Sequence, residues 1–121
     1  YFGDWGQTLD NIKAYDVDAI APGRGGALIG KDAVERAIES TRDFVESTFK
    51  PAQRVAMKGG TLKEAWDAVR AECDPKFKDY AIYEHCLPFN VSRAFDEARG
   101  IWHPRIWTDK RDLEMWAQLQ G

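Results

Sequence analysis

Apolar residues recur every three or four positions along most of the chain, which is the period of an amphipathic α-helix. The regularity is clearest after Thr61, which opens a capping-box pattern that Glu64 completes three residues later. We expect this helix to end at Asp74-Pro75, because the residue before a proline disfavours helical geometry. The apolar stripe of this helix comprises Leu62, Trp66, Val69 and Cys73.

Four other segments show the same helical period. Pro51 is expected to kink or restart the longest of them, because its ring would clash with the backbone one turn back. Asn90 and Thr108 are the residues expected to cap the last two. Between those two helices, Trp102 and Trp107 are expected to lie on an extended stretch that covers the helices. The four segments span about residues 5–15, 32–59, 91–99 and 109–120.

One segment has the character of a β-strand. Residues 17–21 are short, apolar and partly β-branched, and they end at Pro22-Gly23. A strand needs hydrogen-bonding partners along its edges, and the rest of the chain is predicted to be helical. We therefore expect a mostly α chain with one short strand, whose parent sheet lies upstream in a longer protein. The first residue, Tyr1 rather than methionine, agrees with this expectation.

The loop after this strand holds three glycines within residues 23–26 and allows more than one interpretation. Residues 25–32 match the phosphate-loop pattern G-x-x-x-x-G-K-[ST] except at the last position. There Asp32 replaces the hydroxyl that would bind Mg²⁺, and no further strands would build a nucleotide-binding sheet, so an NTPase is disfavoured. The plainer interpretation is a strand-to-helix turn, with Arg24 as a surface charge.

A third interpretation rests on the order of these features. Asp18-Ala19-Ile20-Ala21-Pro22-Gly23-Arg24-Gly25, preceded by Trp5, Thr8 and Leu9, resembles the closing part of the metallo-β-lactamase-fold hydrolases. In that family a W-x-x-[ST]-L helix leads into the last core strand and then into a P-G-H-G loop. The resemblance covers about residues 3–30, a quarter of the chain, and the capped helix at 61–65 is similar to the tails of some members.

The resemblance implies an αββα sandwich of which this chain supplies the C-terminal segment. Residues 1–30 would be the last helix, strand and glycine loop of that core, and residues 31–121 a helical extension that shapes the substrate pocket or a dimer interface. In the intact fold, zinc-bound hydroxide attacks esters, lactams or related bonds. The ligand cluster H-x-H-x-D-H would lie upstream of Tyr1, so the resemblance implies a partner in the upstream part of the same protein.

One position of the family's metal site falls within the chain, and it is occupied by Arg24 instead of histidine. A guanidinium has no lone pair for a metal, so we expect no metal on this chain alone, although the intact family fold would hold zinc. We expect no catalytic residue here. Arg24, with Gly23 and Gly25 beside it, would instead contact the carboxylate or phosphate of a small anionic substrate.

Charge and composition narrow the choice of partner. The chain has 17 Lys and Arg against 20 Asp and Glu, a net charge of −3, and no apolar run long enough to cross a membrane. Basic residues do alternate with aromatic ones over residues 93–111, a pattern found in single-strand binders, but nearby acidic residues offset their charge. We therefore expect no nucleic acid and no membrane partner. A homodimer through the helical extension is a further expectation. A cytoplasmic location is also expected, since no leader pattern is present.

The remaining residues of ligand type lack a motif. Cys73, His85, Cys86 and His103 do not have the spacing of a zinc site or of a Cys–His nucleophile pair. Cys73 lies on an apolar helical stripe and is expected in the core.

Two alternatives to the main hypothesis stay open. One is a self-contained helical module for binding or oligomerisation, with no catalysis. The other is a pseudoenzyme that binds an anion through Arg24.

Overall fold

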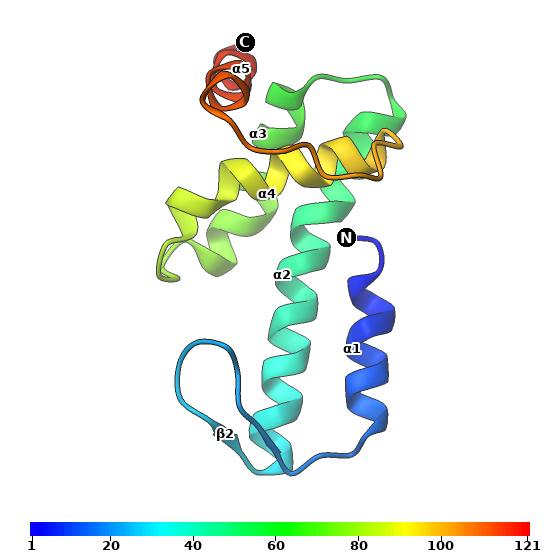
Figure 1. Cartoon of the computed structure of the whole chain (residues 1–121), viewed down its shortest axis with the longest axis vertical. Helices are drawn as coiled ribbons and strands as arrows, with labels where there is room; N and C mark the ends of the chain where they lie inside the picture. Colours follow the sequence, from blue (N-terminus) through cyan, green and yellow to red (C-terminus); the bar gives the residue numbers. More distant parts are fainter.

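The computed structural model describes residues 1–121 and consists of five α-helices and one two-stranded sheet. Helix α2 runs the length of the molecule, with α1 and the strands along one half and α3, α4 and α5 around the other half (Figure 1). The prediction of a mostly helical chain with one short strand region is confirmed. The elements are α1 (Trp5–Ala14), β1 (Ala19–Ile20), β2 (Leu28–Ile29), α2 (Lys31–Met57), α3 (Leu62–Phe77), α4 (Tyr83–Ala98) and α5 (Asp109–Gln120).

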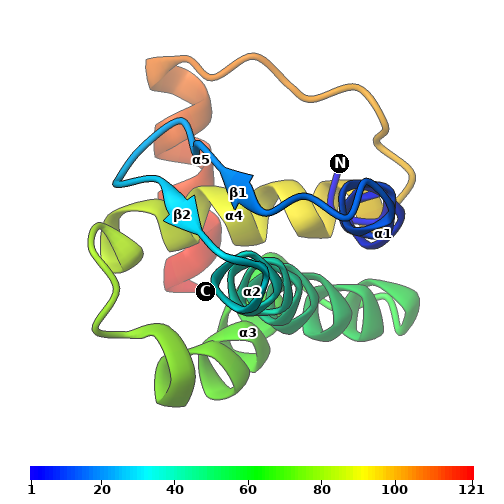
Figure 2. The ribbon, with the colours of Figure 1, turned by 90° about the horizontal axis from the view of Figure 1, so that it is seen from below.

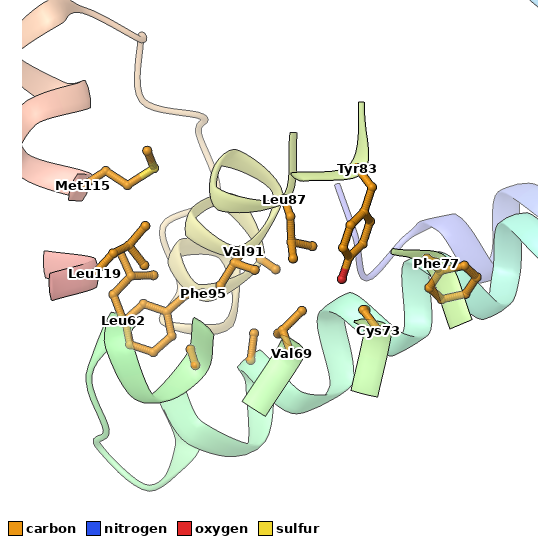
Figure 3. Packing of buried hydrophobic residues seen from close by; sticks show 13 residues of the cluster. Leu62, Val69, Cys73, Phe77, Tyr83, Leu87, Val91, Phe95, Met115 and Leu119 are labelled. Carbon is orange, nitrogen blue, oxygen red and sulfur yellow. The ribbon is translucent and has the colours of Figure 1, made fainter. Parts of the chain in front are cut away.

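The main core lies where α3, α4 and α5 meet the C-terminal half of α2, a part that we call the helical body. Buried side chains of α3, α4 and α5 point toward one another there (Figure 3), and Ala52 of α2 belongs to the same cluster. Burial of each large aliphatic or aromatic side chain contributes about 1.5–3 kcal/mol, so this cluster holds most of the apolar stabilisation. The 13 members are Ala52, Leu62, Ala65, Val69, Cys73, Phe77, Tyr83, Leu87, Val91, Ala94, Phe95, Met115 and Leu119.

A second, smaller cluster holds α1 and the strands against the N-terminal half of α2, a part that we call the arm. Its buried members are only Leu9, Val34 and Ile38. Seen along α2, the β1–β2 hairpin and α1 both lie beside the start of that helix (Figure 2). The arm therefore has far less buried apolar surface than the helical body.

The predicted helix starts at Thr61 and Thr108 are confirmed. The Thr61 hydroxyl accepts the Glu64 N–H at 3.2 Å, and the Glu64 carboxylate accepts the Thr61 N–H at 2.7 Å, which completes the capping box. The Thr108 hydroxyl accepts the Arg111 N–H at 3.2 Å and caps α5. None of the five helices combines the length and the apolar character needed to cross a bilayer.

Helix α2 does not restart at Pro51 but continues through it as one helix to Met57. It ends in a Schellman motif, in which the Gly60 and Gly59 N–H groups reach the Val55 and Ala56 carbonyls at 3.0 Å each. A Cβ on Gly60 would lie 2.6 Å from Val55 Cγ1, so only glycine fits there. The sharp stop allows α3 to turn back against α2.

Two predicted boundaries are wrong. Helix α3 continues through Pro75 to Phe77, which is buried and packs edge-on against Phe44 with ring centroids 5.2 Å apart. Helix α4 begins at Tyr83, so Asn90 lies in its interior and not at its cap. In both cases burial of apolar side chains outweighs the local signal, because tertiary packing supplies most helical stability.

The strand also differs from the prediction, because it has a partner within the chain. β1 pairs antiparallel with β2, with Ala19 opposite Ile29 and Ile20 opposite Leu28. The sequence pattern predicted no strand at residues 28–29, since two residues are too few to show an alternation. The pairing is a short hairpin whose loop carries Arg24.

Candidate functional site

The glycine loop, where the sequence placed substrate contacts, forms the exposed tip of the β1–β2 hairpin. Every residue from 21 to 27 is exposed, and Arg24 makes no ion pair or side-chain hydrogen bond with the rest of the chain. Gly25 has φ +85°, a left-handed conformation that favours glycine, whereas added Cβ atoms on Gly23 and Gly25 would meet nothing within 4 Å. The three predicted residues therefore lie together on an open surface.

The phosphate-loop interpretation gains no support from the surroundings of Lys31. The Lys31 ammonium lies 2.8 Å from the Asp16 carboxylate and is neutralised by it. A phosphate at this loop would have to compete with that carboxylate for the lysine.

The cysteine and histidine residues form no metal site, and Cys73 forms no reactive thiol site. The structure brings together no group of three or more His, Cys, Asp or Glu side chains that could hold a metal ion. The residues of this chain therefore do not fit the zinc ion that the resemblance implies. Cys73 is fully buried, as predicted, and burial raises its pKa to about 11. A thiol that is both buried and protonated is a poor nucleophile.

A cavity with charged walls lies in the helical body, between α4, the extended residues 101–108 and the first turn of α5. Phe89, Ser92, Arg93 and Asp96 follow at i, i+3, i+4 and i+7, so they share one face of α4. The cavity, which we call the Arg111 pocket, has a volume of about 250 Å³. Its lining residues are Phe89, Ser92, Arg93, Asp96, Pro104, Arg105, Trp107 and Arg111.

Asp96 is the acceptor at the centre of this pocket. Arg105 donates to it from Nε at 2.9 Å and from Nη2 at 2.6 Å, a two-bonded pair that fixes the extended segment on α4. Arg111 Nη2 reaches Asp96 at the longer distance of 3.4 Å and donates to Ser92 Oγ at 2.8 Å. The carboxylate is thus shared unequally between two arginines.

Glu97, the next residue, serves the other side of α4. Its buried carboxylate accepts the Phe2 N–H at 3.0 Å and the Gly3 N–H at 2.7 Å, and Arg93 donates to it at 3.2 Å. Arg93 also donates hydrogen bonds to the carbonyls of Ile101 and Trp102, each at 2.9 Å. Glu97 therefore joins the start of the chain to the helical body and has no acceptor capacity directed to Arg111.

Arg111 is buried with only part of its hydrogen-bonding capacity used. Its side chain is 6% exposed, and its Nε and Nη1 atoms have no hydrogen-bond partner. The Trp107 ring lies over the guanidinium with the ring centroid 5.1 Å from Cζ. Burial first, and then the neighbouring Arg105 charge, lower the pKa of Arg111, while the charges of Asp96 and Glu114 act in the opposite direction.

The sequence pattern did not identify this site. It treated residues 93–111 as basic and aromatic residues offset by acidic ones, which describes their composition but not their pairing. The usable signal was the spacing of Phe89, Ser92, Arg93 and Asp96, which mixes polar and apolar residues on one helix face. The burial of Arg111 could not be read from the sequence, since it depends on the path of the segment before α5.

Another pocket, of about 320 Å³, lies between α2 and the turn from α3 to α4 and is mostly apolar. Ile82 lies at its edge with φ +59°, an unfavourable conformation for a β-branched residue. No charged or unpartnered polar group points to a ligand there.

No family model matches the sequence, and no curated protein does either.

Proposed function

We propose that this chain is the C-terminal portion of a metallo-β-lactamase-fold protein, a metal-dependent hydrolase of ester, lactam or related bonds when intact. The observation that supports this proposal most is the order of α1, β1 and the P-G-R-G loop, with the pattern Trp5, Thr8 and Leu9 on α1. In this proposal residues 1–30 complete the αββα core, and residues 31–121 form an extension beside the substrate pocket or a dimer interface. The chain holds no metal-ligand cluster and does not catalyse alone.

The weak packing of the arm supports this proposal. Only three residues are buried there, while Trp5, Tyr15 and Ile29 are exposed to 40%, 79% and 72%. Large exposed apolar side chains are typical of a surface that another part of the protein covers, although the helical body also exposes some, such as Met57 and Ile106. The upstream sandwich is the occupant that the resemblance implies.

Arg24 has a defined place in this proposal. It stands where the family has a histidine ligand, and its exposed guanidinium makes no contact inside the chain. It would face the active site of the upstream core and pair with a carboxylate or phosphate of the substrate, with Gly23 and Gly25 allowing close approach.

The alternative, a self-contained helical binding module, is favoured by one observation, the 13-residue core that packs without the arm. The two proposals differ in what they expect of the arm. A module needs no covering partner, whereas the fragment of a sandwich does.

Amide hydrogen exchange separates them. We would compare this chain with the product of its reading frame extended upstream. We expect residues 5–29 to exchange far more slowly in the longer product, and residues 62–77 of α3, the matched control, to be unchanged. Equal exchange of residues 5–29 in both proteins would contradict the proposal and favour the module.

A further inference from the structure

The helical body contains a cluster of arginines in which one buried member, Arg111, lacks a close ion-pair partner. Three arginines, Arg93, Arg105 and Arg111, surround two buried carboxylates, those of Asp96 and Glu97. Glu97 pairs with Arg93 and Asp96 pairs closely with Arg105, so Arg111 is the arginine without a full partner. The charge of Glu114 also acts on Arg111, but Glu114 supplies no acceptor to its nitrogens.

The loose ion pairing of Arg111 coincides with missing hydrogen-bond acceptors. Arg111 Nε and Nη1 are buried and unpartnered, although a guanidinium in a protein interior normally has all its N–H groups satisfied. The acceptors nearest to it are used, since Ser92 takes Nη2 and the Asp96 oxygens accept from Arg105 at 2.6–2.9 Å. An additional acceptor with negative charge would relieve both deficits.

The pocket beside Arg111 has walls of two kinds. Phe89 and Trp107 pack edge-on with ring centroids 5.0 Å apart and form an apolar side, and Pro104 continues it. The arginines form the other side. A volume of about 250 Å³ is enough for a single aromatic ring with a small polar group.

We propose that the Arg111 pocket binds a small monocarboxylate whose body is an apolar ring or short hydrocarbon. The carboxylate supplies the acceptor that Arg111 lacks, and the apolar body lies against Phe89 and Trp107. Phosphate has no apolar surface to cover the wall formed by Phe89 and Trp107, which favours a carboxylate with an apolar body. All of these residues belong to the helical body and the segment before α5, so the inference does not depend on the proposed function.

Binding requires a small movement of Trp107. Arg111 Nε and Nη1 are covered in the structure, and the Trp107 ring is among the groups over the guanidinium. Trp107 lies on residues 101–108, which form no helix or strand and carry exposed Trp102 and Ile106. The ring can therefore shift without breaking backbone hydrogen bonds of a regular element.

The test is a titration of the whole chain with benzoate at constant ionic strength, with benzyl alcohol as the uncharged counterpart and inorganic phosphate as the other anion. The arginine Nε–H signals in ¹⁵N–¹H spectra report the site. We expect benzoate to shift the Arg111 signal in a saturable way at millimolar concentration or below, and benzyl alcohol and phosphate to leave it unchanged.

Variants assign the effect to the pocket. Arg111→Gln should weaken benzoate binding at least about tenfold, because a charge-assisted hydrogen bond is lost, whereas the exposed Arg36→Gln should bind as the wild type does. If Arg111→Gln does not fold, the shift of the wild-type Arg111 signal still shows whether benzoate binds beside Arg111. No saturable shift, equal binding of benzyl alcohol, or an equal or larger shift with phosphate would overturn the proposal.

Discussion

Asp96 of α4 and Arg105 of the extended segment form a two-bonded ion pair, with Nε and Nη2 of the arginine 2.9 and 2.6 Å from the carboxylate. The carboxylate is buried, and the longer contact from buried Arg111 also ends on it. This one acceptor holds the segment before α5 on α4 and partly balances a second guanidinium. Loss of its charge would leave Arg111 buried without a counter-charge.

Asp96→Asn should therefore destabilise the chain strongly. Removal of one member of a buried charge network typically costs about 3–5 kcal/mol, and the partial exposure of Arg105 places this case near the lower end. Urea denaturation followed by circular dichroism measures the free energy of unfolding. The exposed pair of Asp67 with Lys63 supplies the control, since Asp67→Asn should cost less than about 1 kcal/mol. Similar losses for both variants would contradict the role given to Asp96.

Cys73 should make stability depend on pH in the alkaline range. Burial raises the pKa of its thiol from 9.0 to about 11, so the unfolded chain releases this proton at lower pH than the folded chain does. The contribution of this thiol to the free energy of unfolding is therefore complete below about pH 9. It falls as pH rises from 9 toward 11, by at most about 1.4 kcal/mol per pH unit.

The measurement is the slope of unfolding free energy against pH between 8 and 10 in wild type, Cys73→Ala and Cys86→Ala. The fall should be flatter in Cys73→Ala and unchanged in Cys86→Ala. Burial and the hydrogen bond to Asp74 raise the pKa of Tyr83 as well, but all three proteins keep this residue, so its contribution to the slope cancels in the comparison. Equal slopes in all three proteins would show that the Cys73 proton does not contribute.

Ile82 should be replaceable with a gain in stability. Its φ of +59° places it in the left-handed region, which costs a non-glycine residue about 1–2 kcal/mol, and its side chain is 62% exposed, so little packing would be lost. Ile82→Gly is expected to raise the free energy of unfolding by about 0.5–1 kcal/mol after the added freedom of the unfolded chain is counted. Ile106→Gly, at an exposed position without positive φ, should give no gain. A loss at residue 82 would mean that its packing outweighs the backbone strain.

Thr61→Ala should weaken the start of α3. The variant removes the hydroxyl that accepts the Glu64 N–H and leaves the capping box incomplete, at an expected cost of about 1 kcal/mol. Thr8→Ala on α1 removes a hydroxyl that bonds only to the carbonyl one turn back, and it should be neutral within about 0.5 kcal/mol. Chemical denaturation of both variants compares a capping threonine with a threonine in a helix interior.

Added zinc should leave the melting temperature of this chain unchanged. Its His and Cys side chains form no group of three with the acidic residues, and Arg24 cannot ligate a metal. Differential scanning calorimetry with and without excess zinc tests this. A clear rise in melting temperature that His85→Ala abolishes would show a metal site that the structure does not form.

The sequence predicted best where a signal is local and repeated. The caps at Thr61 and Thr108 and the ends of the segments predicted to stop near residues 59 and 99 lie where expected, because each depends on a side chain or a conformation set within one turn. The continuation of α3 through Pro75 depends on burial of Phe77 against α2, which no local pattern carries.

The candidate site was predicted less well for the same reason. The sequence selected Arg24 because its neighbours form a motif, and the structure places it on an open hairpin loop. Arg111 has no motif, and its burial results from the way that residues 101–108 cross α4. Such a site becomes visible only when segments that are distant in the sequence have been brought together.

The coding sequence directly upstream of Tyr1 tests the central claim most directly. If the chain is the C-terminal portion of a metallo-β-lactamase-fold protein, the frame continues upstream for roughly 150–200 residues, the size of one further domain, and encodes the H-x-H-x-D-H cluster. A start codon close to Tyr1, or an upstream frame without that cluster, would contradict the claim.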